Sequence, residues 1–176
     1  MEQRKHTRLP NYDYASPGGY FVTICTREKK PLFGNIKTPV GRGPCAPPNT
    51  ARTIAEEWIG RIQGKFPNWT VDNSVVMPNH VHLLLQAHPL NAAGHAGPAL
   101  QDVVAWYKTM TTNAVIRAVK AGAMPPFEKA VWQTGFYESV IRGQEHYLRT
   151  WQYIDENPAR WPEDEYFVPP CIIPPA

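Results

Sequence analysis

The stretch Met77-Pro78-Asn79-His80-Val81-His82-Leu83-Leu84-Leu85 leads one apolar run through a Pro-Asn turn into a second apolar run. Side chains two residues apart in a β-strand point to the same face, so His80 and His82 are expected to lie side by side. Val81 and Leu83 then point to the opposite face, into a core. Because two adjacent imidazoles can hold one divalent cation, this stretch predicts a strand that carries a metal site.

Length and composition are ordinary for a globular protein. The chain has 176 residues, of which 43% are apolar and 19% are charged. This length suits one domain over 1–176, with a basic N-terminal arm over about 1–18 and a Pro-rich C-terminal tail over about 162–176. The formal net charge of +3 permits a nucleic-acid partner but does not require one.

Cysteine usage and hydropathy bear on the compartment. The three cysteines, Cys25, Cys45 and Cys171, are odd in number and far apart, so they form neither a disulfide framework nor a zinc-binding pattern. The N-terminus lacks the apolar run of a signal peptide, and no stretch is apolar enough over a sufficient length to cross a membrane. We therefore expect a cytoplasmic protein with no membrane partner.

Hydrophobic periodicity divides the chain into strands and helices. Strands are expected over 20–26, 32–36, 69–77 and 80–86, with extended segments over 131–133 and 136–141. Helices are expected from a cap at 49 or 50 to a break at Gly64 and Pro67, from 100 to about 120, and from 144 to about 156. Residues 38–48 and 88–98 are rich in Pro and Gly and predict loops. This order predicts an α+β sandwich with helices on one face of an antiparallel sheet and the other face free.

The last expected helix, 144–156, separates into two faces at about 100° of rotation per residue. Its apolar stripe, which is predicted to face the core, consists of Tyr147, Leu148, Trp151 and Ile154. Tyr153 and Asn157 lie together on the other side, four residues apart. A tyrosine used only for packing should lie on the apolar stripe, so Tyr153 is a candidate for chemistry.

Tyrosine, asparagine and two histidines suit phosphodiester chemistry. Tyr153 can attack a phosphodiester if a cation polarises the phosphate and stabilises the developing charge. The side-chain oxygen of Asn157 would complete a His-His-Asn site for Mg²⁺ or Mn²⁺. The product, a phosphotyrosine ester, keeps the energy of the broken bond, so the strand can later be rejoined.

Each of these motifs also has an ordinary structural interpretation. A His-x-His pair is by itself more often a surface or hydrogen-bonded pair than a metal site. Tyr153 alone is an exposed aromatic residue, and Asn157 before a proline is an ordinary helix end. Two other functions stay open: a nucleic-acid-binding regulator on the same fold without chemistry, and a metal-dependent hydrolase of a small phosphoester that uses water as the nucleophile.

The combination of motifs resembles the single-tyrosine His-hydrophobe-His (HUH) transposases, and within them the REP-associated tyrosine transposases of bacteria. The stretches that carry the resemblance are residues 12–26, 75–82, 106–109 and 132–158. The resemblance implies a ferredoxin-like, RNA-recognition-motif-like fold with the active site on one face of the sheet. It also implies cleavage of single-stranded DNA at or near a hairpin through a 5′-phosphotyrosine intermediate.

The family's functional residues fall on particular positions of this chain. The resemblance assigns His80, His82 and Asn157 to a Mg²⁺ or Mn²⁺ ion and makes Tyr153 the nucleophile. Among the basic residues of the last two helices, Lys108 and Arg149 are the favoured contacts to single-stranded or hairpin DNA. Branches of the family differ in whether the tyrosine helix serves its own subunit or a partner, so a monomer and a homodimer both stay open.

Overall fold

The computed structural model describes residues 12–34, 49–89 and 97–168. Most of the expected N-terminal arm, the Pro-rich loop and the end of the tail, together with Cys45 and Cys171, lie outside the described residues. The elements are β1 Gly18–Cys25, the 3-10 turn η1 Arg27–Lys29, α1 Thr50–Gly60, α2 Ile62–Lys65, β2 Trp69–Val76, β3 His80–Ala87, α3 Leu100–Lys120, β4 Tyr137–Val140, α4 Gln144–Glu156 and the 3-10 turn η2 Trp161–Glu163.

The four strands form one antiparallel sheet in the order β2-β3-β1-β4. The chain order β1-α1-β2-β3-α3-β4 on this sheet is the ferredoxin-like arrangement, and it confirms the predicted α+β class. The central strands β1 and β3 carry the residues that matter most for the site. Thr23 is the cross-strand partner of His82, and Cys25 is the partner of His80.

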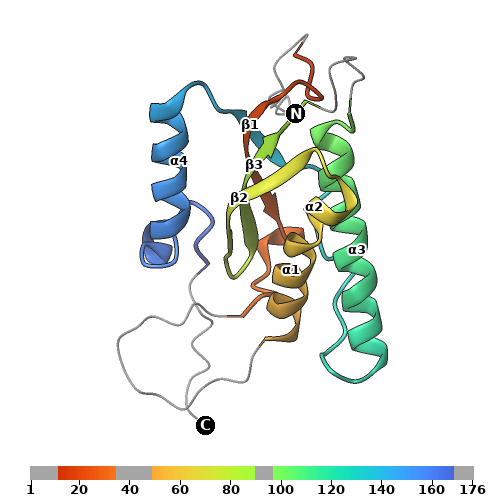
Figure 1. Cartoon of the computed structure of the whole chain (residues 1–176). Helices are drawn as coiled ribbons and strands as arrows, with labels where there is room; N and C mark the ends of the chain where they lie inside the picture. The colour runs from red at the N-terminus through yellow and green to blue at the C-terminus, as the bar shows by residue number, and fades with distance from the viewer. Residues whose placement is uncertain (1–11, 35–48, 90–96, 169–176) are drawn as a thin grey trace, which may run out of the picture.

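One face of the sheet carries the hydrophobic core, which α1 and α3 cover (Figure 1). Alternate residues of the central strands are buried in it, namely Tyr20, Val22 and Ile24 of β1 and Val81, Leu83 and Leu85 of β3. The predicted alternation along β3 is therefore confirmed. The helices are also joined by a buried hydrogen bond, in which the Tyr107 hydroxyl donates to the Ala55 carbonyl at 3.2 Å.

The helix α4 lies on the opposite face of the sheet from α1 and α3, where it contacts β2 and β3 (Figure 1). The apolar stripe predicted for it is wrong in part: Ile154 is buried as expected, but Leu148 is 56% exposed and Trp151 is 36% exposed. Ile154 is buried together with Thr150 and Asn157, which fall on one stripe with it at spacings of four and three. The helix is thus rotated by about a quarter turn from the predicted orientation, because it packs on a partly polar surface and not on the core.

The strand expected over 32–36 is wrong for the part that the structure describes. Residues 31–34 form a turn in which the Gly34 amide donates to the Pro31 carbonyl at 3.3 Å, and Gly34 has a φ of 72°. Phe33 enters the core instead, with its ring centroid 5.4 Å from that of Trp132. The place beside β1 is taken by β4, so the chain leaves the sheet after β1.

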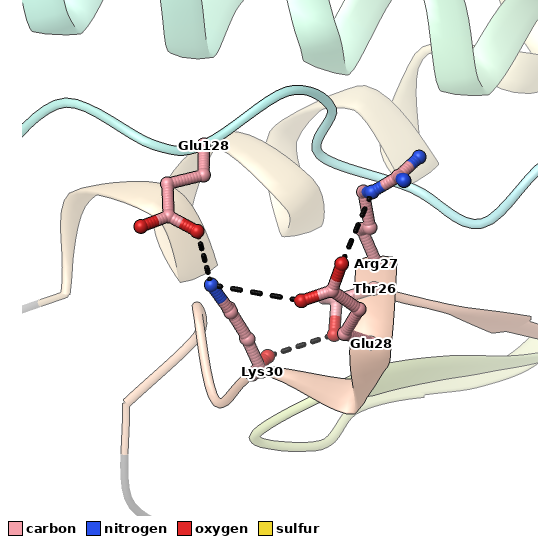
Figure 2. A network of polar contacts seen from close by, with 5 residues as sticks. All are labelled: Thr26, Arg27, Glu28, Lys30 and Glu128. Atoms are coloured by element: carbon pink, nitrogen blue, oxygen red, sulfur yellow. Dashed lines mark hydrogen bonds and ion pairs between the residues drawn. The ribbon is translucent and has the colours of Figure 1, made fainter.

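The turn that follows β1 is held by polar contacts (Figure 2). The Lys30 ammonium lies 2.6 Å from a carboxylate oxygen of Glu128 and 3.7 Å from one of Glu28. The Thr26 hydroxyl donates to the Lys30 carbonyl at 2.7 Å. These contacts connect the turn to the segment that precedes β4.

Among the helices of the described residues, none combines the length and hydropathy that a membrane span requires.

Candidate active site

The two histidines of β3 meet on the sheet face that α4 covers. His80 Nε2 and His82 Nε2 lie 3.0 Å apart. Two ligands at right angles around an ion, each at about 2.1 Å, would also be separated by about 3.0 Å. The predicted pairing of the two rings on one face is therefore correct. The face is not open, however, because both side chains are buried.

The remaining ring nitrogens are held by neighbouring side chains. His80 Nδ1 lies 2.9 Å from Asn79 Oδ1, and His82 Nδ1 lies 2.9 Å from Thr23 Oγ1. The Asn79 amide nitrogen donates to the Lys29 and Tyr166 carbonyls at 3.1 and 2.7 Å, so its oxygen is the acceptor for the His80 ring. A proton on Nδ1 of His80 leaves the Nε2 lone pair available to a cation.

Burial keeps both imidazoles neutral. Desolvation, with a smaller contribution from the Lys29 ammonium, lowers the pKa of His80 to about 3. Desolvation also lowers the pKa of His82 to about 3, the adjacent His80 contributes in the same direction, and Asp164 opposes the shift. Neutral imidazole is the form that ligates metals, so the pair is in the ligating state at neutral pH.

Tyr153 reaches the histidines from α4. Its ring centroid lies 5.3 Å from that of His82 and 5.8 Å from that of Phe21, and the residue is 40% exposed. Burial raises the pKa of Tyr153, and the Asp164 carboxylate raises it further, while the Asn157 amide acts in the opposite direction. The phenol is therefore protonated at neutral pH, and any nucleophilic attack by its oxygen would require loss of the proton.

Asn157 is the residue on which the fit of a metal can be tested. It lies at the end of α4, is only 4% exposed, and its Oδ1 atom has no hydrogen-bond partner. Buried polar atoms are almost always paired, so an unpaired amide oxygen indicates a missing partner. An amide oxygen and imidazole nitrogens can ligate the same divalent cation. Asn157, His80 and His82 therefore fit the implied Mg²⁺ or Mn²⁺.

A hollow of about 220 Å³ opens beside these groups and is lined by Tyr153, Asn157, Arg160, Glu163, Asp164 and Glu165. Three of these residues, Glu163, Asp164 and Glu165, belong to residues 161–166, which we call the strap. The Trp161 and Tyr166 rings of the strap lie 5.9 and 4.8 Å from the His80 ring. Part of the expected Pro-rich C-terminal tail therefore lies against the site.

The two predicted DNA contacts lie in different surroundings. The Lys108 ammonium donates to the carbonyls of Gln133, Thr134 and Gly135 at 2.5, 3.0 and 3.3 Å, and burial lowers its pKa. Arg149 is on the surface of α4, with its Nη1 atom 3.2 Å from Oε1 of Glu145. Arg149 is one helical turn before Tyr153, whereas Lys108 is engaged with the backbone of the chain itself.

Sequence reasoning missed three residues near the two candidate metal ligands. These are Asn79, which contacts His80, Thr23, which contacts His82, and Asp164. Asn79 was visible inside the Met-Pro-Asn-His stretch, and Thr23 follows from the pairing of β1 with β3. Asp164 is one of three residues, with His80 and His82, whose potential ligand atoms all lie within 4.8 Å of one another. Its separation in sequence from the histidines left no periodic signal.

Comparison with known proteins places the chain in a family. The family model described as "Transposase IS200 like" matches residues 49–157, which include both histidines, Tyr153 and Asn157. An uncharacterized protein of Haemophilus influenzae is 30% identical over 177 residues, covering 96% of this chain and 95% of that protein.

A solved structure of a REP-associated tyrosine transposase bound to a REP hairpin has the same fold. The TM-score is 0.52 at 19% identity, over 87% of this chain and 73% of that chain. The family model spans more than half of the sequence, and the resemblance inferred from the motifs is confirmed at the level of the family. The chain belongs to the IS200-like transposase family.

Proposed function

We propose that this transposase cleaves and rejoins single-stranded DNA at or near hairpins, with Tyr153 as the nucleophile. The observation that carries the proposal is the position of Tyr153, whose ring lies 5.3 Å from that of His82 beside a hollow that Asn157 also lines. The hairpin bound by the structurally similar transposase supports DNA of this form as the substrate.

The chemistry assigned to Tyr153 is a transesterification. The phenol oxygen forms a bond to phosphorus while the bond from phosphorus to the 3′-oxygen of the preceding nucleotide breaks. The phenol loses its proton, and the departing 3′-oxygen takes one up. The protein then holds the 5′-phosphate as a tyrosine ester, and attack by a free 3′-hydroxyl reverses the step and rejoins a strand.

His80, His82 and Asn157 are the residues that we propose hold Mg²⁺ or Mn²⁺. When bound there, the cation would supply Lewis-acid stabilisation of charge on the phosphate oxygens. The second partners define what the chain itself contributes. Asn79 orients His80, Thr23 orients His82, and the burial of both rings keeps them neutral. Tyr153 and the histidine pair meet within one chain, which supports action of the tyrosine on its own subunit.

Of the two proposed DNA contacts, Arg149 is the better placed. It projects from the same side of α4 as Tyr153, and its side chain is largely exposed. A phosphate beside the cleaved one would lie within reach of this guanidinium. Lys108 would contact DNA only after giving up carbonyl partners in residues 133–135.

The deciding experiment is a search for a covalent adduct. The full chain is incubated with a hairpin-bearing single-stranded oligonucleotide and Mn²⁺, and the products are separated on a denaturing gel. We expect the wild type to form a protein–DNA adduct and Tyr153→Phe to form none, although it still folds and binds Mn²⁺. Tyr147→Phe is the matched control on the same helix, since its hydroxyl contacts Asp72 and not the histidines.

The other two functions predict different products. A small-phosphoester hydrolase that uses water would form no adduct with the oligonucleotide, and its hydrolase activity would be retained in Tyr153→Phe. A regulator without chemistry would bind the hairpin and leave it intact in every variant. An adduct that persists in Tyr153→Phe and disappears in Tyr147→Phe would show that the nucleophile has been assigned to the wrong tyrosine.

A further inference from the structure

The strap after α4 is fixed to the same part of the sheet as the histidines. The Tyr166 carbonyl accepts a hydrogen bond from the Asn79 amide at 2.7 Å, and the Lys29 ammonium lies 4.5 Å from the centre of the Tyr166 ring. At the other end of the strap, the Trp161 ring packs near His80. Contacts at Trp161 and at Tyr166 therefore fix the position of the strap residues between them.

Asp164 is one of these strap residues, and its carboxylate faces the site. Its potential ligand atom and those of His80 and His82 all lie within 4.8 Å of one another. Two ligands on opposite sides of an ion with bonds of about 2.1 Å lie about 4.2 Å apart, so only a small movement of the carboxylate is needed to complete a shared site. One carboxylate oxygen accepts from the Tyr166 amide at 2.7 Å, and each oxygen keeps a further lone pair.

Asp164 also determines which end of the Asn157 amide is free. Asn157 Nδ2 donates to Asp164 Oδ2 at 3.1 Å, and the buried Asn157 Oδ1 is left unpaired. The carboxylate thus occupies the donor end of the amide and keeps the acceptor end available. An unpaired oxygen on a buried side chain beside this carboxylate is an independent sign that a ligand is missing from the cluster.

We propose that Asp164 is a further ligand of the cation, and that its second oxygen holds the Asn157 amide with its oxygen toward the ion. This inference rests on the metal-dependent function proposed above. Two neutral imidazoles and an amide bring no negative charge to a divalent cation, whereas Mg²⁺ and Mn²⁺ favour carboxylate oxygen. Asp164 supplies this charge before the DNA phosphate arrives, so the site binds its cation in the absence of DNA.

The test measures Mn²⁺ binding to the full chain by isothermal titration calorimetry without DNA. We expect Asp164→Asn to lower the Mn²⁺ affinity at least about tenfold relative to the wild type, as is typical when a metal site loses a partner of its ligands. Glu163→Gln is the matched control, because it removes the same charge from the same hollow at a carboxylate that pairs with Arg160. It should bind Mn²⁺ like the wild type.

Each outcome bears on a different statement. If Asp164→Asn binds Mn²⁺ as tightly as the wild type, Asp164 is not a ligand of the cation. The metal-dependent function proposed above would still stand. Equal losses in Asp164→Asn and Glu163→Gln would reduce its role to general electrostatics and overturn ligation. A wild type that binds no Mn²⁺ would overturn the metal-dependent function itself. Asp164→Ala serves as a second variant, and failure of both variants to fold would contradict the inference by making Asp164 a structural residue.

Discussion

Replacing Thr23 with valine tests whether the hydrogen bond at Nδ1 of the proposed ligand His82 controls metal binding. Thr23 Oγ1 and His82 Nδ1 lie 2.9 Å apart, and both side chains are buried. For His82 to present its Nε2 lone pair to a cation, Nδ1 must carry the ring proton and needs an acceptor. Valine matches the shape of threonine but offers no acceptor, so the metal-bound state of this variant contains an unpaired buried N–H.

The size of the effect differs between the two states. A buried polar group without a partner costs about 1–3 kcal/mol. In the metal-free protein, His82 can instead place its proton on Nε2 and donate to His80 Nε2 at 3.0 Å, so the free energy of unfolding should fall by only about 1 kcal/mol. In the metal-bound state the proton cannot move to Nε2, because that nitrogen would ligate the cation. The buried Nδ1–H stays unpaired, and the Mn²⁺ affinity should fall about 10–100-fold.

Urea unfolding of the metal-free protein and calorimetric titration with MnCl₂ measure these two quantities separately. Thr23→Ser is the control, because it keeps the hydroxyl and should bind Mn²⁺ like the wild type. A Thr23→Val variant that folds and keeps the wild-type Mn²⁺ affinity would refute the reasoning. A large loss of stability in Thr23→Ser alone would instead point to the packing of the threonine methyl group, which valine keeps and serine lacks.

Two further predictions concern stability and are measured by urea unfolding. Ile154→Ala should lower the free energy of unfolding by about 2–5 kcal/mol because the side chain is buried under α4. Leu148→Ala should change it by no more than about 0.5 kcal/mol because that side chain faces solvent. The reverse order would contradict the orientation of the helix. Lys108→Met should cost about 1–3 kcal/mol, since it removes the donor for the carbonyls of residues 133–135, and an unchanged midpoint would show that these contacts are dispensable.

The sequence predicts well those strands and helices whose hydrophobic residues repeat with one period because they all pack on the same core. Val81 and Leu83 alternate with His80 and His82, and a single register satisfies both the core and the site. The helix from Leu100 to Lys120 was predictable for the same reason, because its apolar stripe packs on the core.

The face of α4 was not predictable from periodicity, because the helix does not pack on the core. Leu148 and Trp151 suggest an apolar stripe, but the sheet face below the helix presents histidines and Thr23, and Thr150 and Asn157 pack there. Tyr153 nevertheless flanks the buried face and is 40% exposed, and its chemical role stays a prediction. Asp164 gave no local signal because its neighbours come from β3 and from the end of α4.

The register between β1 and β3 explains why the second partner of His82 can be built into the fold at all. Thr23 and His82 are direct cross-strand partners, so the hydrogen bond between them is set by strand pairing and needs no loop to find its position. A slip of one residue would turn both histidines toward the core and expose Val81 on the site face, at the cost of the buried alternation along the strand. The hydrophobic core on one face of the sheet therefore fixes the geometry of the polar site on the other. The same residues that drive folding hold the two imidazoles 3.0 Å apart, so the proposed cation site would form only as the chain folds.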